Sequence, residues 1–122
     1  MRPVAAIAQM RTTDLAGSIR FYTEVLGLSL AFRYQDFYAG LEAGGHCIHL
    51  KQVDEPDPSM PYVAADEHLH LYFETADAGA LATAIEAKGA PLAKPLHETP
   101  WRRREFAIRD DQGHTLCFGE RI

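Results

Sequence analysis

Two stretches of the chain repeat the same order of hydrophobic patterns, about half a chain apart. Apolar residues at helical spacing follow Asp14, a residue type that caps helices, and stop at Gly27. A second helical stretch runs from Asp77 to Gly89. Each follows a strand-like run and is itself followed by several more. This order predicts two β-α-β-β-β modules.

Alternation of apolar and polar residues and the positions of turn residues place the strands of these modules. The predicted strands are 4–10, 28–34, 37–42 and 46–53 in the first half, and 67–73, 91–94, 103–109 and 115–120 in the second. The fold class is therefore α+β, with two βαβββ modules forming a pseudo-symmetric mixed-sheet half-shell around a concave cavity.

Prolines indicate where the modules meet. Three prolines between positions 56 and 61 argue against regular structure in 54–61, and 95–100 is expected to be an irregular loop. We therefore expect a single domain, 1–122, with a first module over 1–53, a linker over 54–66 and a second module over 67–122.

Composition and charge indicate which kinds of partner the protein can bind and in which cellular compartment it works. The chain has 122 residues, of which 47% are hydrophobic and 24% charged, values typical of a globular domain. A net charge of −5 argues against nucleic-acid binding, and no apolar run is long enough to span a membrane. Cys47 and Cys117 lie far apart without a disulfide pattern, and 1–4 lack a signal-peptide pattern, so we expect a cytoplasmic protein.

Strand alternation also predicts which side chains face away from the helices. Three histidines and a thiol are more than a solvated groove needs, so this face is expected to carry the function. His114, in the turn before the last strand, is expected to be exposed. The polar residues and thiol expected on the concave face are Gln9, His49, His68, His70, Tyr72 and Cys117.

Several motifs resemble those of the vicinal oxygen chelate superfamily, which includes glyoxalase I, extradiol dioxygenases, and fosfomycin- and bleomycin-resistance proteins. With the duplicated order, they cover nearly the whole chain. The same motifs occur in enzymes and in pure binders, so the resemblance implies the fold more than the chemistry. The motifs are Arg11-Thr-Thr-Asp-Leu15, Ser18-Ile-Arg-Phe-Tyr22, Val25-Leu-Gly-Leu28 and the closing run 104–114.

The resemblance also implies four metal-ligand positions, one on each of four strands. They fall on Ile7, His49, His68 and Cys117. In metal-dependent members, the positions of His49 and Cys117 usually carry carboxylates. Without those carboxylates, we expect neither glyoxalase I chemistry nor extradiol cleavage. His49, His68 and Cys117 remain a credible zinc set, which would suit a metal-dependent lyase or transferase.

The preferred interpretation is a metal-free binder of the bleomycin-resistance type, acting as a homodimer, and the metal-dependent enzyme is the alternative. Phe32 and Phe37 are expected to serve mainly in packing. The net negative charge of the chain suits a cationic ligand. Whether the protein is an enzyme stays open between these readings. The predicted ligand-binding residues are Gln9, Tyr38, Tyr62, His70, Tyr72, Trp101, Arg103 and Glu105.

Overall fold

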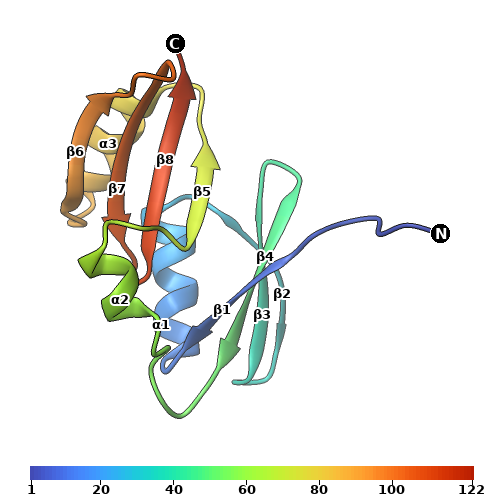
Figure 1. Cartoon of the computed structure of the whole chain (residues 1–122). Coiled ribbons are helices and arrows are strands. Elements are labelled where there is room, and N and C mark those ends of the chain that lie inside the picture. Colours follow the sequence, from blue (N-terminus) through green and yellow to red (C-terminus); the bar gives the residue numbers. More distant parts are fainter. The chain divides into compact units, whose positions relative to one another are not determined.

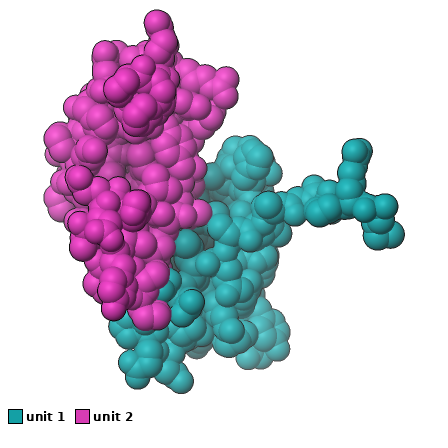
Figure 2. Space-filling view, viewed as in Figure 1, with its two compact units in different colours: residues 1–57 teal, residues 58–122 magenta.

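The computed structural model describes all residues from 1 to 122 and divides into two compact units (Figure 2). Unit 1 comprises Met1–Asp57 and unit 2 comprises Pro58–Ile122. Each unit contains a four-stranded mixed sheet and a helix between its first two strands (Figure 1). The predicted α+β fold of two similar modules is therefore confirmed. No helix has the length and apolar character needed to cross a membrane.

The sheet of unit 1 has the strand order β1-β4-β3-β2. Its outer strand β1 pairs in parallel with β4, and the other pairs are antiparallel. The elements are β1 (Ala8–Thr12), α1 (Leu15–Arg20), the π-helical turn η1 (Phe21–Val25), β2 (Ser29–Tyr34), β3 (Tyr38–Ala43) and β4 (His46–Gln52).

The sheet of unit 2 repeats this topology in the order β5-β8-β7-β6. Here β5 pairs in parallel with β8, and β8-β7-β6 are antiparallel. The elements are α2 (Met60–Ala65), β5 (Leu71–Glu74), α3 (Ala78–Ala87), β6 (Leu92–Glu98), β7 (Arg103–Arg109) and β8 (Thr115–Arg121).

The predicted helix caps form in both units. The Asp14 carboxylate accepts a hydrogen bond from the Gly17 backbone N–H at 3.0 Å, and Asp77 accepts one from Ala80 at 2.9 Å. These bonds satisfy backbone donors that the first helical turn leaves without partners. The duplication seen in the sequence is thus repeated at the level of single hydrogen bonds.

The last strand of each unit supplies a second, equivalent cap. Gln52 Oε1 accepts from the Leu15 N–H at 2.8 Å, and Glu120 Oε1 accepts from the Ala78 N–H at 3.1 Å. Both bonds join the end of a strand to the start of a helix more than thirty residues away. The ends of β4 and β8 therefore occupy equivalent positions in the two units.

Apolar side chains on one face of each sheet form the core. In unit 2 this core contains a stack of three rings, in which Phe118 lies 5.0 Å from both Phe73 and Phe106, nearly parallel to each. In unit 1 the buried positions alternate along the strands, as expected for a sheet covered on one side. Gly40 is the exception, because the Phe32 ring covers it on the other face. The buried strand residues of unit 1 are Met10, Thr12, Ala39, Gly40, Leu41, Ile48 and Leu50.

Prolines are tolerated in two segments that were predicted to be irregular. The linker contains α2, with Pro61 in its first turn, where a missing N–H costs no hydrogen bond. β6 continues through Pro95 to Glu98, although 95–100 was predicted to be a loop. β6 is an edge strand with register shifts between Leu92 and His97, the setting in which a sheet accepts proline.

The first strand of each unit begins later than predicted. β1 starts at Ala8 rather than at position 4, and Val4 is fully exposed. β5 starts at Leu71 rather than at position 67, and Glu67 has a positive φ of 56°. Alternating patterns thus extend beyond the residues that have a strand partner.

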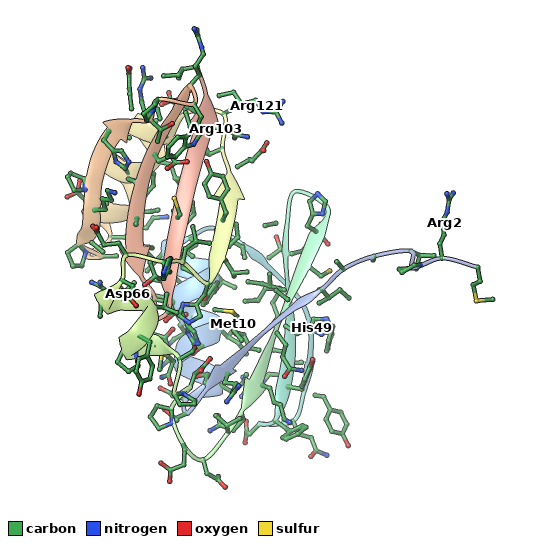
Figure 3. The ribbon with its side chains drawn as sticks, in the orientation of Figure 1. Arg2, Met10, His49, Asp66, Arg103 and Arg121 are labelled. Atoms are coloured by element: carbon green, nitrogen blue, oxygen red, sulfur yellow. The ribbon has the colours of Figure 1, made fainter.

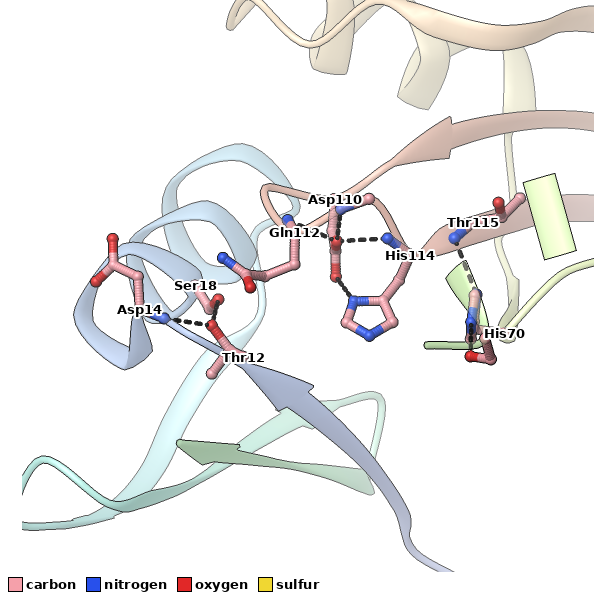
Figure 4. Close-up of polar contacts among 10 residues, drawn as sticks. Thr12, Asp14, Ser18, His70, Asp110, Gln112, His114 and Thr115 are labelled. Carbon is pink, nitrogen blue, oxygen red and sulfur yellow. Dashed lines mark hydrogen bonds and ion pairs between the residues drawn. The ribbon is translucent and has the colours of Figure 1, made fainter. Parts of the chain in front are cut away.

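His114 is buried, with 1% of its surface exposed, so its predicted exposure is wrong. Its Nδ1 donates to Asp110 Oδ2 at 2.9 Å (Figure 4). Asp110 Oδ1 accepts backbone N–H bonds from Gln112, Gly113 and His114, at 2.9 to 3.0 Å. This carboxylate organises the whole turn before β8, and it draws the imidazole inward.

Candidate functional site

A cavity of about 270 Å³ lies in unit 2. β7 and β8 contribute alternate residues to it, including Glu105, Ala107 and Cys117, from the face opposite the buried ring stack. Register brings Ala107 directly beside Cys117. The other lining residues are Ala64, Glu67, His68, Leu69, Ala93, Lys94, His97, Thr99, Trp101, Phe106, Arg109 and Thr115.

A hydrogen bond between two strands fixes Glu105 at this cavity. The Tyr72 hydroxyl donates to Glu105 Oε2 at 2.8 Å. It reaches that carboxylate over Gly119, where an added Cβ would overlap the hydroxyl. Burial, followed by the hydrogen bond and charge of Glu105, raises the pKa of Tyr72 to about 12. Tyr72 is therefore a donor at neutral pH, and it orients the carboxylate.

Arg103, labelled in Figure 3, lies beside Tyr72 and is not among the cavity-lining residues. Its guanidinium carbon lies 5.8 Å from the centre of the Tyr72 ring, within cation–π range. It also forms an ion pair with Glu74 at 3.3 Å. The predicted binding residue Arg103 thus contacts Tyr72 and Glu74 within unit 2.

Cys117 presents a protonated thiol. Its side chain is 9% exposed, and burial together with the negative charge of Glu105 raises its pKa to about 11, although Lys94 partly offsets this. At neutral pH almost no thiolate forms in the absence of a cation. Cys117 then behaves as a small hydrophobic group with a weak S–H donor.

Alkylation should distinguish the two cysteines. At pH 8 we expect iodoacetamide to modify the partly exposed Cys47 at least about tenfold faster than Cys117, because the thiolate is the nucleophile. Mass spectrometry of digests at successive times measures both rates, and a Cys47→Ser variant isolates the slow one. Equal rates would contradict the protonated state of Cys117.

The raised pKa of Cys117 also makes the free energy of unfolding depend on pH in the alkaline range. The Cys117 pKa is raised in the folded protein above the ordinary value of 9.0, so the unfolded chain ionises first. Stability is therefore unaffected by this group below about pH 9 and falls as the pH rises from there towards 11. A Cys117→Ala variant should lose this part of the alkaline decline.

Unit 1 carries a second polar cluster on the open face of its sheet. Gln9 Nε2 donates to the Tyr38 hydroxyl at 2.9 Å, and that hydroxyl is 2.9 Å from His49 Nδ1. The Phe32 ring meets His49 edge-on at 5.4 Å. It lies over Gly40, where a Cβ would overlap the ring. Because Gly40 has no side chain, the Phe32 ring can lie close to the sheet and contact His49.

The duplicated caps show which site positions are equivalent. Three residues before Gln52 and Glu120 stand His49 and Cys117 (Figure 3 labels His49). Both belong to the middle of a strand that pairs on two sides. Their equivalence agrees with the two carboxylate positions that the family resemblance implied.

The same duplication aligns His70, not His68, with Ile7. Both lie seven residues before the helix-capping aspartates. His70 precedes β5, where its Nδ1 accepts from the Thr115 N–H at 3.1 Å and its Nε2 lies 3.1 Å from Ser59 Oγ (Figure 4). His70 is therefore held by the backbone of β8 and is not among the cavity-lining residues.

The predicted zinc ligands are divided between the two units. His68 and Cys117 line the cavity of unit 2, whereas His49 belongs to unit 1 and has Nδ1 engaged with Tyr38. Histidine and cysteine are suitable zinc donors. Within either unit, no group of three or more His, Cys, Asp or Glu side chains is arranged to hold a metal ion.

The remaining predicted residues have different environments. Trp101 lines the cavity and is 68% exposed, so its ring is available for stacking. Tyr62, on α2, is 74% exposed and lies outside the lining.

Sequence reasoning missed Lys94 and His97 as site residues. The interruption by Pro95 concealed that β6 continues along the cavity. A lysine and a histidine three residues apart around that proline were the available signal.

A family model described as the Glyoxalase/Bleomycin resistance protein/Dioxygenase superfamily matches residues 4–118. No curated protein matches the sequence.

Similar solved structures share this architecture at low sequence identity. The bleomycin-binding protein of Streptomyces verticillus, solved with copper(II)-bleomycin, is 22% identical over 97% of this chain and 96% of its own, with a TM-score of 0.71. A lactoylglutathione lyase from Agrobacterium tumefaciens is 21% identical over 98% and 96%, with a TM-score of 0.75. A glyoxalase/bleomycin resistance protein/dioxygenase from Alicyclobacillus acidocaldarius is 20% identical over 100% and 96%, with a TM-score of 0.79.

Proposed function

This chain belongs to the glyoxalase/bleomycin resistance protein/dioxygenase superfamily, and on that premise we propose that it is a small-molecule-binding protein. Its ligand is an organic molecule that enters the cavity of unit 2 and stacks on Trp101. The observation that carries this proposal is an open cavity with one exposed indole and polar groups held in fixed positions. Such pockets orient a ligand by a few polar contacts within an apolar lining.

Glu105 supplies the clearest polar contact. Tyr72 occupies its Oε2 and leaves Oε1 without a hydrogen bond in the structure, so Oε1 is available to a ligand N–H or O–H group. Thr115 adds a buried hydroxyl that has no hydrogen-bond partner. We propose that these groups, rather than Cys117, give the cavity its polar selectivity.

The protein of Streptomyces verticillus supplies a probe, since it was solved with copper(II)-bleomycin. A cavity of about 270 Å³ would take only part of so large a molecule. We propose Gln9 and Tyr38, which share a hydrogen bond on the open face of unit 1, as separate ligand contacts of that unit. His70, Tyr72 and Arg103 then act as positioning residues, and Tyr62 as a peripheral contact.

A homodimer is part of this proposal. The sheet of unit 1 exposes the aromatic rings of Phe32 at 45% and of Tyr34 at 60%. Neighbouring aromatic side chains of this size favour an apolar partner surface. Both cysteines are free thiols, which supports a reducing compartment such as the cytoplasm.

A metal-dependent lyase or transferase is the second candidate, favoured by His68 and Cys117 sharing one cavity. Metal analysis of protein purified without chelator separates the two candidates. The binder predicts less than about 0.1 equivalent of zinc in the parent and in His68→Ala. Stoichiometric zinc that is lost in His68→Ala would replace the binder with the enzyme.

Filling the cavity tests the binding role. Ala93 lines the cavity on the edge strand β6, and Ala93→Phe should weaken bleomycin binding at least about tenfold by occupying the space. Calorimetric titration with metal-free and copper-loaded bleomycin measures the affinity. Ala87→Phe, at the end of α3 and outside the lining, is the control. Equal loss in both variants would contradict the assignment to the cavity.

A further inference from the structure

Two uncompensated positive charges lie side by side on the open face of unit 1. Arg11 on β1 and Lys51 on β4 are register partners in the parallel pair. Their neighbours Met10 and Leu50 are buried on the opposite face, so both cations belong to the face that α1 leaves open. Neither forms an ion pair. Adjacent strands are only about 4.8 Å apart, so the two charges repel each other.

Among the strand residues of this face, the only carboxylate is that of Glu42. The strand residue Glu42 shares the face, but it pairs with Cys47, four residues along β4 from Lys51. That offset corresponds to about 13 Å along the strand, beyond the Debye length at physiological salt. A protein with a net charge of −5 thus places two free cations together where an oxyanion would relieve their repulsion.

Aromatic rings surround the same pair. Lys51 Nζ lies 5.9 Å from the centre of the Phe37 ring, and Phe37 lies 6.2 Å from Tyr38. Tyr38 is the register partner of Lys51 on β3. It also meets the His49 ring edge-on at 5.2 Å. The cations therefore adjoin a group of half-exposed rings that can receive a planar ligand.

We propose that the open face of unit 1 binds a small aromatic anion. Its carboxylate or phosphate lies between Arg11 and Lys51, and its ring packs against Phe37 and Tyr38. The inference rests on the proposed function, because it names the chemistry of a ligand that a small-molecule binder would take. It differs from the cationic ligand that the overall charge favoured.

Probes that separate ring from charge test this proposal. Benzoate and phenyl phosphate should shift the backbone amide NMR signals of Arg11, Lys51 and their strand neighbours. Cyclohexanecarboxylate, which lacks the aromatic ring, should bind more weakly, and benzylamine should not bind there. A stronger response to benzoate assigns a carboxylate ligand and a stronger response to phenyl phosphate assigns a phosphate ester. Equal binding of benzylamine would overturn the proposal.

Charge removal provides the matched variants. Lys51→Gln and Arg11→Gln should each weaken benzoate binding roughly fivefold or more, whereas Lys88→Gln at the end of α3 should leave it unchanged. Lys51→Gln should also keep or raise the melting temperature, because it removes a repulsion. A purely structural lysine would lower it. Unchanged benzoate affinity in both charge variants would overturn the proposal.

A variant in the unit 2 cavity shows whether benzoate binds to unit 1 or to that cavity. Trp101→Ala should not alter benzoate binding to unit 1. If Trp101→Ala abolishes it while Lys51→Gln has no effect, the aromatic anion belongs to the cavity. The inference then fails, and the proposed small-molecule function stands.

Discussion

Replacing Asp110 with alanine should lower the free energy of unfolding by about 3–5 kcal/mol, one of the two largest effects expected for this protein. The Asp110 carboxylate accepts three backbone N–H bonds and the His114 imidazole N–H within a buried turn. Its removal leaves four donors without this acceptor, and the two donors of His114 are buried away from water. Denaturant titration followed by circular dichroism measures the change.

Two variants sharpen this prediction. Asp110→Asn keeps the shape and one acceptor oxygen, and should lose less stability than Asp110→Ala. Asp36→Ala removes an exposed carboxylate that pairs with Arg33, and should cost less than about 1 kcal/mol. Similar losses for Asp36→Ala and Asp110→Ala would show that the buried turn is not what the carboxylate stabilises.

Phe106→Ala should lower the free energy of unfolding by about 3–5 kcal/mol. Phe106 is fully buried and forms the end of the three-ring stack beneath the cavity face. Truncation leaves a void between β7 and the stacked Phe118 ring. Thermal and denaturant unfolding measure the loss, and ligand affinity should fall in parallel because Phe106 lies between Glu105 and Ala107, which face the cavity.

Phe106→Leu and Leu96→Ala control this result. Leucine retains most of the apolar volume and should recover more than half of the stability. Leu96, on the edge strand β6, is 41% exposed, so Leu96→Ala should change stability by at most about 0.5–1 kcal/mol. A loss in Phe106→Ala no larger than in Leu96→Ala would contradict the central place of the ring stack.

Local capping signals made most of the fold predictable. Asp14 and Asp77 cap helices as expected, and Gly27 and Gly89 take the positive φ that ends them. Such signals depend on neighbouring residues and are therefore readable in sequence. The extent of β6 was not, because an edge strand can accept Pro95 only through its position in the sheet.

The candidate site was predictable only in part, because burial and strand ends depend on contacts between residues that are distant in the sequence. Alternation correctly placed Tyr72 and Cys117 side by side on one face, since they are register partners. The exposure of His114 expected from its place in a turn was wrong, because the Asp110 carboxylate holds the imidazole in a buried position. Alternation also extended β5 over His68 and His70, although neither lies within the strand.

The position of Trp101 offers the most direct measurement of the proposed function. It is the only tryptophan of the chain and it lines the cavity, so its emission reports on that cavity alone. Titration with metal-free bleomycin should quench or shift this emission in a saturable way, and Ala93→Phe should abolish the change. Calorimetric binding without any change in Trp101 emission would contradict a ligand in the cavity of unit 2.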